Sequence, residues 1–342
     1  MADAKPFHVC WCITGDEMAT SLDPVLREKL LNRRHTLQKS ITGVSPGAKV
    51  INLLQQVDQA LERMDSGTYG LCQVCHDAIE PERLAADPLA CFCLDHLTPA
   101  DQRALEHDLR LARQIQDGLL PKTDSRFGRW QIAYHYQPAG MVSGDYCDVV
   151  DAADRGLYFM LGDVSGKGIS AAMLMANLHA LFRALISAGL PLGELVTEAS
   201  RAFCETTLAT HYATLVCGNA LASGEVELCN AGHLPCLHIQ AGEVAEVPST
   251  GLPLGMFCSQ EFALTRVHLQ PGDSLLLYSD GLTEAEDGSG AAYGVERLRR
   301  LAADCGAEPK SLLGACRKDL DTFRGTTALN DDLTLMAVSR AF

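Results

Sequence analysis

Four acidic motifs, each placed directly after an apolar run, constrain the fold of the C-terminal two thirds of this chain. An Asp at a strand end, next to a Gly, projects into a cleft while its backbone bends close to a ligand. Several such Asp residues that converge would form an oxygen-ligand site for Mg2+ or Mn2+. One Asp-Gly pair alone is a common turn, so the set of four carries the prediction. The motifs are Ser143-Gly-Asp145, Leu161-Gly-Asp163, Tyr278-Ser-Asp280-Gly281 and Asn330-Asp331-Asp332-Leu-Thr334.

Short β-like runs and two long helical stretches follow one another after about residue 128. The helical stretches cover residues 169–188 and 192–208. Runs of strands separated by paired helices predict a layered α+β domain rather than a strictly alternating α/β one. The predicted strands cover residues 130–136, 157–161, 212–220, 225–229, 274–278 and 333–338.

The N-terminal third has a helical pattern instead. Two helices over residues 16–65, separated by the Gly- and Pro-containing stretch 41–47, predict a helical hairpin. Another helix over residues 100–120 ends before Pro121. The predicted organisation is an N-terminal tail (1–15), a helical hairpin with a small cysteine-bearing segment (16–98), a linker helix (99–121) and a catalytic domain (122–342).

The cysteine-bearing segment contains two ligand pairs, Cys72-Gln-Val-Cys75 and Cys93-Leu-Asp-His96. Each pair can supply two ligands to an ion from a tight turn. Together the two pairs predict a tetrahedral Cys3His site for one Zn2+. Cys91 or His76 could replace one of the four ligands. The other readings are an irregular loop that binds no metal and a redox disulfide.

This segment resembles the zinc finger of the DksA/TraR family, on Gly67-Thr-Tyr-Gly-Leu-Cys72, Pro81-Glu-Arg-Leu84 and Cys93. The resemblance covers about residues 20–97 and implies a helical hairpin followed by a four-ligand zinc finger. His96 stands where the family pattern has Cys. The hairpin tip, 41–48, lacks the acidic residue on which that family's action on RNA polymerase depends. The resemblance therefore supports a zinc-stapled module more than polymerase binding.

Composition sets limits on partners. The 342-residue chain is 47% hydrophobic and 21% charged, which is an ordinary globular balance. Its net charge of -15 and pI near 5.1 argue against binding to nucleic acid or docking on an anionic membrane. No signal peptide is visible, and the apolar stretch from Ile169 to Leu190 is interrupted by polar residues, so we expect a buried helix and a cytoplasmic protein.

The chain has 14 Cys residues. A long chain without an export signal predicts reduced thiols rather than a disulfide framework. Most of these residues lie in apolar runs, where we expect them to act as small core hydrophobes. The examples are Cys204, Cys217, Cys229 and Cys236.

The acidic motifs resemble those of the SpoIIE-like branch of the PPM phosphatases, in order over about residues 130–340. The resemblance implies two antiparallel sheets packed face to face with helices outside. A phosphate-binding Walker A loop is excluded at Gly162-Asp-Val-Ser-Gly-Lys-Gly168, because Lys167 is followed by Gly rather than Ser or Thr; Lys167 is read as a solvated or structural residue. The matching runs are 142–148, 162–168, 230–233, 251–255, 271–284 and 331–334.

The resemblance also implies roles for these residues. Asp163 would bridge two metal ions, Mn2+ or Mg2+. Asp145 and the carbonyl of Val164 would complete one metal site, and Asp280 and Asp331 the other. The two cations would lower the pKa of a shared water, and hydroxide would attack phosphorus in line, without a Cys or Ser nucleophile. Asp148 and Asp332 are read as neighbours outside the ligand set, and Asn230-Ala-Gly-His233 as a structured turn near the site.

The helix from Leu109 to Pro121 resembles the one that precedes the catalytic domain in regulated members of the same branch, where it transmits a signal. It could pack on the catalytic domain or form a homodimer.

The sequence thus predicts a metal-dependent protein serine/threonine phosphatase, with an anti-sigma-factor antagonist in bacterial partner switching as the substrate that the resemblance implies. The alternatives are a DksA-like RNA polymerase-binding regulator with a degenerate phosphatase domain, and a zinc- or redox-sensing module.

Overall fold

The computed structural model describes residues 15–41, 48–96, 99–121, 125–208, 210–306 and 308–342. The predicted N-terminal tail, apart from Gly15, and most of the hairpin tip lie outside these ranges. The chain divides into two compact units, Met1–Glu106 and His107–Phe342, and the division falls within helix α4 (Pro99–Leu119). Each unit is described by itself.

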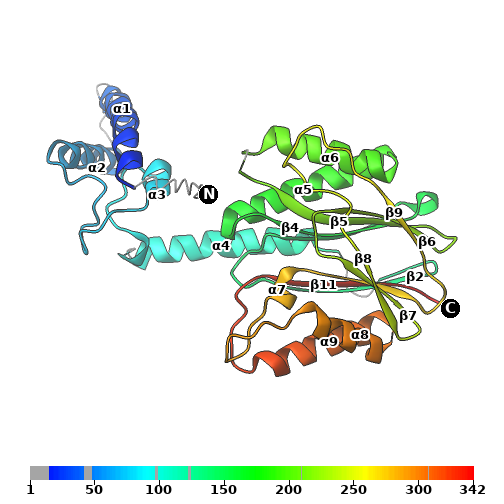
Figure 1. Ribbon diagram of the computed structural model, residues 1–342. Coiled ribbons are helices and arrows are strands. Elements are labelled where there is room, and N and C mark those ends of the chain that lie inside the picture. The colour runs from blue at the N-terminus through cyan, green and yellow to red at the C-terminus, as the bar shows by residue number, and fades with distance from the viewer. Residues whose placement is uncertain (1–14, 42–47, 97–98, 122–124, 209, 307) are drawn as a thin grey trace, which may run out of the picture. The chain divides into compact units, whose positions relative to one another are not determined.

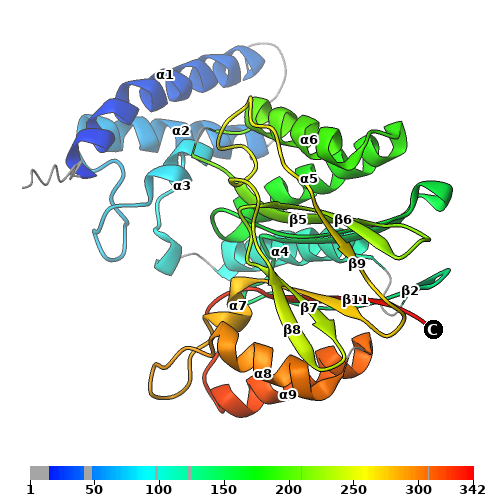
Figure 2. The same ribbon diagram turned by 45° about the vertical axis from the view of Figure 1, so that its right-hand side comes forward.

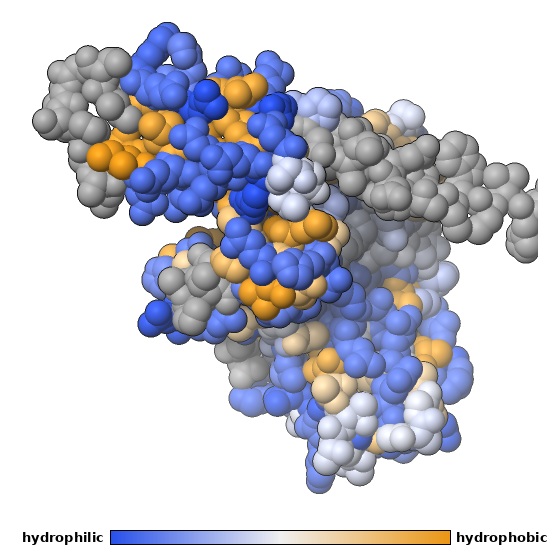
Figure 3. All heavy atoms as spheres, turned by 90° about the vertical axis from the view of Figure 1, so that its left-hand side faces the viewer, coloured by the Kyte–Doolittle hydropathy of each residue, from blue (hydrophilic) through white to orange (hydrophobic). Residues whose placement is uncertain are grey.

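The first unit contains a pair of helices and a cysteine-bearing segment. The helices are α1 (Gly15–Ile41) and α2 (Ala48–Asp65), followed by α3 (Pro81–Ala86) and the short 3-10 helix η1 (Leu94–His96). Leu30 packs against the apolar face of α2, whereas Leu26, one turn earlier, packs against the cysteine-bearing segment. Hydrophobic side chains are interspersed with hydrophilic ones on the face drawn in Figure 3.

Two antiparallel sheets form the centre of the second unit (Figure 1). The six-stranded sheet has the order β1 (Ser125–Phe127), β2 (Trp130–Gln137), β11 (Leu333–Arg340), β10 (Ser274–Tyr278), β7 (Cys236–Gln240) and β8 (Glu243–Val247). The five-stranded sheet has the order β3 (Asp145–Asp151), β4 (Leu157–Val164), β5 (Ala213–Ala220), β6 (Glu225–Ala231) and β9 (Thr265–His268).

Helices cover the outer face of each sheet (Figures 1 and 2). Helices α5 (Gly168–Ala188) and α6 (Leu192–Thr206) pack on the five-stranded sheet. Helices α8 (Val295–Cys305) and α9 (Pro309–Arg324) pack on the six-stranded sheet. The shorter helices are η2 (Ala153–Arg155) and α7 (Asp280–Thr283). The predicted architecture of two antiparallel sheets with helices outside is confirmed.

The side chains of β4 point alternately to its two faces, and they connect the five-stranded sheet to the helices on one side and to the six-stranded sheet on the other. Tyr158 and Met160 point to the helix side and join the core under α5 and α6. Leu157, Phe159 and Leu161 join the core between the two sheets, with residues of β2, β10 and β11. Because side chains of a strand alternate between faces and both faces are covered, this strand reads as an unbroken apolar run.

Among the described residues, α5 alone has the length and composition that a membrane span would need. Such a single helix is weak evidence, since core helices of globular domains meet the same criteria. One side of α5 packs into the core on the five-stranded sheet, as expected of a helix that covers a sheet. The buried residues of α5 are Ala171, Met175, Leu178, Phe182 and Ile186.

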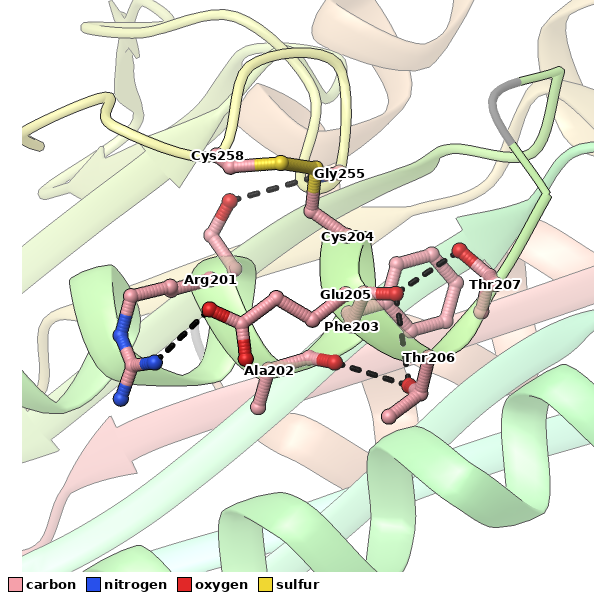
Figure 4. Close-up of a disulfide and its surroundings, with 10 residues drawn as sticks. Arg201, Ala202, Phe203, Cys204, Glu205, Thr206, Thr207, Gly255 and Cys258 are labelled. Atoms are coloured by element: carbon pink, nitrogen blue, oxygen red, sulfur yellow. Dashed lines mark hydrogen bonds and ion pairs between the residues drawn. A yellow bond between two sulfur atoms is a disulfide. The ribbon is translucent and has the colours of Figure 1, made fainter.

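A disulfide between Cys204 and Cys258 corrects the prediction of reduced thiols for these two residues, whereas the other ten cysteines that the structure describes are free (Figure 4). It joins α6 to the loop between β8 and β9, with 5.5 Å between the two Cα atoms. Cys204 is only partly buried and is not the small core hydrophobe that its apolar surroundings predicted. The same loop is held by a hydrogen bond from the Gly255 amide to Ser200 Oγ.

Candidate active site

Asp145 and Asp163 are partners across the β3–β4 ladder. Asp145 begins β3 and Asp163 is the next-to-last residue of β4, so antiparallel pairing places both at the same end of the sheet. Asp145 is 1% exposed. Its Oδ2 accepts a hydrogen bond from Thr334 Oγ1 of β11, which connects this carboxylate to the other sheet.

Asp280 and Asp331 reach the same end of the unit from the six-stranded sheet. Asp280 follows β10, and Asp331 precedes β11, its antiparallel neighbour. Ser279 joins the two chain segments, because its Oγ donates to the carbonyl of Asp332 and accepts from the amide of Thr334. Gly281 permits the approach, since a Cβ there would lie 2.1 Å from the Asp332 carbonyl oxygen.

The proposed carbonyl ligand, Val164, lies beside Gly144 and Asp163. A Cβ at Gly144 would lie 3.0 Å from the Val164 carbonyl oxygen and 3.4 Å from Asp163 Oδ1. Real Cβ contacts are rarely this close. Gly144 therefore leaves open a space lined by two of the oxygen atoms that the sequence predicts as metal ligands.

Burial and neighbouring carboxylates raise the pKa of three aspartates of this site, Asp145, Asp163 and Asp280. Burial, followed by the charges of Asp280 and Asp331, raises the pKa of Asp163 to about 7. Burial and the charge of Asp163 hold the pKa of Asp145 well above its usual range, and burial and Asp331 raise that of Asp280. Clustered carboxylates of this kind fit a divalent cation, which would favour their charged forms.

Among the residues that the structure describes, the compact group of possible metal ligands is the one at Cys72, whose ligand atoms lie within 4.8 Å of one another, and the four aspartates do not form such a group. Two-metal sites are wider, with metal ions about 3.5–4 Å apart. Three of the four aspartates line two pockets. Asp163 and Asp280 line one together with His233, and Asp331 lines the other together with Asp332.

Asp332 and Asp148 have other partners. Asp332 accepts hydrogen bonds from the amides of Ala139 and Gly144, and so holds the loop that leads into β3. Asp148 is fully buried and accepts two hydrogen bonds, at 2.7 and 2.8 Å, from Arg183 of α5. Both carboxylates are engaged in contacts that position other residues.

His233 bridges the two sheets next to Asp163. Its Nε2 lies 3.1 Å from the carbonyl of Tyr278, and its Nδ1 lies 2.8 Å from Thr214 Oγ1. Because a carbonyl only accepts, Nε2 carries the proton and Nδ1 accepts from the hydroxyl. Burial lowers the pKa of His233 to about 4, so the imidazole is neutral. Asn230 Oδ1 accepts from the His233 amide, which gives the predicted turn its structure.

Sequence reasoning missed several residues that hold the site, including Gln116. Its buried side chain donates to the carbonyl of Ser143 and accepts from the Ser143 amide, two residues before Asp145. Leu119, also on α4, packs into the core under α5. The second half of the linker helix thus packs on the catalytic unit, one of the two arrangements left open. The sequence did carry a signal for Gln116, because this residue is polar and lies within the apolar stripe of the helix.

The first unit brings together Cys72, Cys75, Cys93 and His96. The Cys75 and Cys93 sulfur atoms lie 3.8 Å apart, and Cys93 Sγ lies 3.2 Å from His96 Nδ1. Burial would raise the pKa of Cys72, but hydrogen bonds from backbone amides, Cys75 first, lower it to about 6. The alternative ligands lie outside the group, and Cys91 Sγ donates to the carbonyl of Leu89 instead.

Comparison with known proteins agrees with this geometry. The family described as Stage II sporulation protein E (SpoIIE) matches residues 153–341, more than half of the chain. The chain belongs to the SpoIIE family. The match includes Asp163, Asp280 and Asp331, whereas Asp145 precedes its first residue.

Three individual proteins illustrate the likeness of this SpoIIE-family chain. Phosphoserine phosphatase RsbP of Bacillus subtilis is 30% identical over 185 residues, which are 52% of this chain and 46% of RsbP. A structure of the RsbU and RsbW domains of Rv1364c from Mycobacterium tuberculosis is 29% identical, with a TM-score of 0.54, over 62% of this chain and 60% of that one.

The third is the SiaA-PP2C domain of Pseudomonas aeruginosa, which shares the fold. It has a TM-score of 0.61 at 19% identity and covers 72% of this chain and 100% of that domain. The chain spans about half the length of the curated relatives that it matches.

Proposed function

We propose that this SpoIIE-family chain is a metal-dependent protein serine/threonine phosphatase, a phosphoric monoester hydrolase. The observation that carries the proposal is that four aspartates lie at one end of the second unit. Asp145 and Asp163 come from one sheet, and Asp280 and Asp331 from the other. The name of RsbP, a phosphoserine phosphatase, supports the same reaction.

The residues that would hold two Mn2+ or Mg2+ ions are Asp145, Asp163, Asp280 and Asp331, with the carbonyl of Val164. When bound, these cations would supply a hydroxide nucleophile at neutral pH and neutralise charge on the phosphoryl group. Other residues of the chain hold these aspartates in position. Thr334 orients Asp145, and Ser279 fixes the two loops that carry Asp280 and Asp331. His233, buried and neutral, holds Thr214 beside Asp163.

The test is hydrolysis of a phosphoserine peptide with and without Mn2+. We expect activity that requires the metal and falls by at least about a hundredfold in Asp163→Asn, because this change removes a charge from the centre of the site. Asp154→Asn, on the exposed helix η2, is the matched control and should retain full activity. Equal rates in Asp163→Asn and the unchanged protein would exclude the two-metal mechanism.

The substrate that we propose is a phosphorylated anti-sigma-factor antagonist in a cytoplasmic partner-switching pathway. The alternative of a polymerase-binding regulator with a degenerate phosphatase domain is not favoured, because all four aspartates are present and the SpoIIE match is extensive. The test of this substrate is to measure the rates at which the protein dephosphorylates phosphorylated candidate partners from the same genome. Selective dephosphorylation of one antagonist is expected, and equal rates on unrelated phosphoproteins would contradict it.

We propose that Cys72, Cys75, Cys93 and His96 hold one Zn2+ in a DksA/TraR-like module. The support is the closeness of the four ligand atoms, which suits a tetrahedral structural site. Metal analysis of the purified protein should give one zinc per chain. Cys72→Ser should lose the zinc, whereas the matched control Cys91→Ser should keep it. Equal zinc content in these two variants would overturn the assignment.

A homodimer through the linker helix is a further part of the proposal. Leu111 and Ile115, one turn apart on α4, are 45% and 68% exposed. Light scattering should give twice the chain mass for the full-length protein and the chain mass for Ile115→Glu. A monomer at all concentrations would contradict the dimer.

A further inference from the structure

Lys167 presents its ammonium group at the acidic end of the site. Its Nζ donates to Asp331 Oδ2 at 2.9 Å and to the carbonyl of Asn330 at 3.3 Å. The side chains of Lys167 and Asp331 are 74% and 43% exposed. Since ion pairs this exposed contribute little to stability, the contact does not explain why a lysine stands here.

The backbone around Lys167 leaves its side chain exposed rather than packed against neighbouring residues. Gly166 and Gly168, on either side, have φ values of +101° and +71°, a region that favours glycine. A Cβ built at either glycine meets nothing within 4 Å. The lysine is therefore the only side chain between two glycines in an open loop, directly between β4 with Asp163 and the first turn of α5.

Charge distinguishes Lys167 from the other residues of the two pockets. The residues described as lining them include Asp163, Asp280, Asp331 and Asp332, and Lys167 is the sole permanent cation among them, since His233 is neutral. A dianionic phosphoryl group that enters this acidic region needs cationic partners, and Lys167 is the one that these residues supply.

We propose that Lys167 binds the phosphoryl group of the substrate, with Nζ donating to a non-bridging oxygen in place of Asp331 Oδ2. The inference rests on the proposed phosphatase function, because it assigns a contact in that reaction. A lysine suits the role, since its flexible stem carries three donors and can exchange one oxygen acceptor for another without backbone movement. This replaces the reading of Lys167 as a merely solvated or structural residue.

The experiment measures binding of inorganic phosphate to the full-length, Mg2+-loaded protein by calorimetry, together with KM and kcat on a phosphoserine peptide. Lys167→Met should weaken phosphate binding by about tenfold and raise KM, because it removes a charge-assisted hydrogen bond. Lys167→Arg should stay within about threefold of the unchanged protein. Lys318→Met, at an exposed position of α9, is the matched control and should change neither constant.

Metal titration of each variant separates phosphate binding from metal loading. The proposal requires that Lys167→Met bind Mg2+ no more than about twofold more weakly than the unchanged protein. Phosphate affinity unaltered in Lys167→Met, or a loss matched by weaker Mg2+ binding, would overturn it. If no phosphopeptide is hydrolysed by the unchanged protein, the proposed function fails, while the phosphate titration still decides whether Lys167 binds the anion.

Discussion

The side chain of Gln116 and the backbone of Ser143 form a reciprocal pair of hydrogen bonds, at 2.7 and 3.0 Å. Gln116 lies on α4, and Ser143 begins the Ser-Gly-Asp motif that ends at Asp145. The pair is buried, so the amide replaces water for both backbone groups of Ser143. One helix residue thereby fixes the approach of a predicted metal ligand.

Replacing Gln116 with Leu should leave both backbone groups of Ser143 buried without partners. Each such group costs about 1–3 kcal/mol, so we expect the free energy of unfolding to fall by about 2 kcal/mol or more and Mn2+ to bind more weakly. Urea unfolding and metal titration check this. Gln114→Leu, on the exposed side of the same helix, is the control. An unfolding free energy equal to that of the control would show that the pair is dispensable.

Gly144→Ala should weaken metal binding at the Val164 carbonyl. The added methyl group would lie 3.0 Å from that oxygen and 3.2 Å from Ala171 Cβ, so one of these neighbours must move. We expect Mn2+ affinity to fall by at least about tenfold, with partial recovery of activity at high metal concentration. Gly140→Ala is the matched control, because its Cβ would meet only the Val142 carbonyl at 3.7 Å. Equal affinities in both variants would exclude this steric explanation.

Metal binding should release a proton near neutral pH. The pKa of Asp163 is raised to about 7, so below pH 7 this carboxyl carries a proton that a cation must displace. Apparent metal affinity is therefore expected to rise with pH through about 7. Calorimetry in buffers with different ionisation enthalpies would measure about half a proton or more at pH 6.5, and a smaller number as pH rises above 7. Proton release that does not depend on pH would contradict the assignment.

Removing the disulfide with Cys204→Ser and Cys258→Ser should destabilise the second unit. The bond closes a loop across 54 residues, and disulfides typically contribute about 2–4 kcal/mol. Pairing of Leu254 with Ala213 already holds part of this loop, so we expect the lower end of that range. Thermal unfolding with and without dithiothreitol provides the measurement. The reductant should lower the melting temperature of the unchanged protein and leave the double variant unaffected; identical behaviour of the two would contradict the prediction.

The sequence predicts the parts of this molecule that depend on neighbours along the chain. The apolar runs before Asp163 and Asp280 correspond to β4 and β10, because a strand buried on both faces is apolar throughout. Strand β8 was missed, since Glu243 and Glu246 interrupt its apolar residues and make this short segment resemble a loop. Helices α8 and α9 were also missed, although their buried residues recur at helical spacing.

Contacts between distant segments could not be predicted in the same way. Gln116 and Ser143 are 27 residues apart, and Cys204 and Cys258 are 54 apart. No local pattern specifies either partner, because both pairs exist only once the helices have packed on the five-stranded sheet. The pairing of Asp145 with Asp163 across the β3–β4 ladder is likewise not specified by any local pattern. The motifs identified these two aspartates as candidates, and only the fold shows that they face each other.

His233 should make the stability of the second unit depend on pH. Its pKa falls from 6.5 to about 4 because burial penalises the imidazolium, so the unfolded chain binds a proton between these values and the folded chain does not. Stability from this group is therefore complete above pH 6.5 and is lost as pH falls toward 4, by about 3 kcal/mol in total. His233→Gln should reduce stability at pH 7, where it disturbs the contacts to Thr214 and Tyr278, but should flatten the decline toward pH 4. Urea unfolding of both proteins at pH 7, 6 and 5 measures the difference, and parallel declines would show that His233 is not the group responsible.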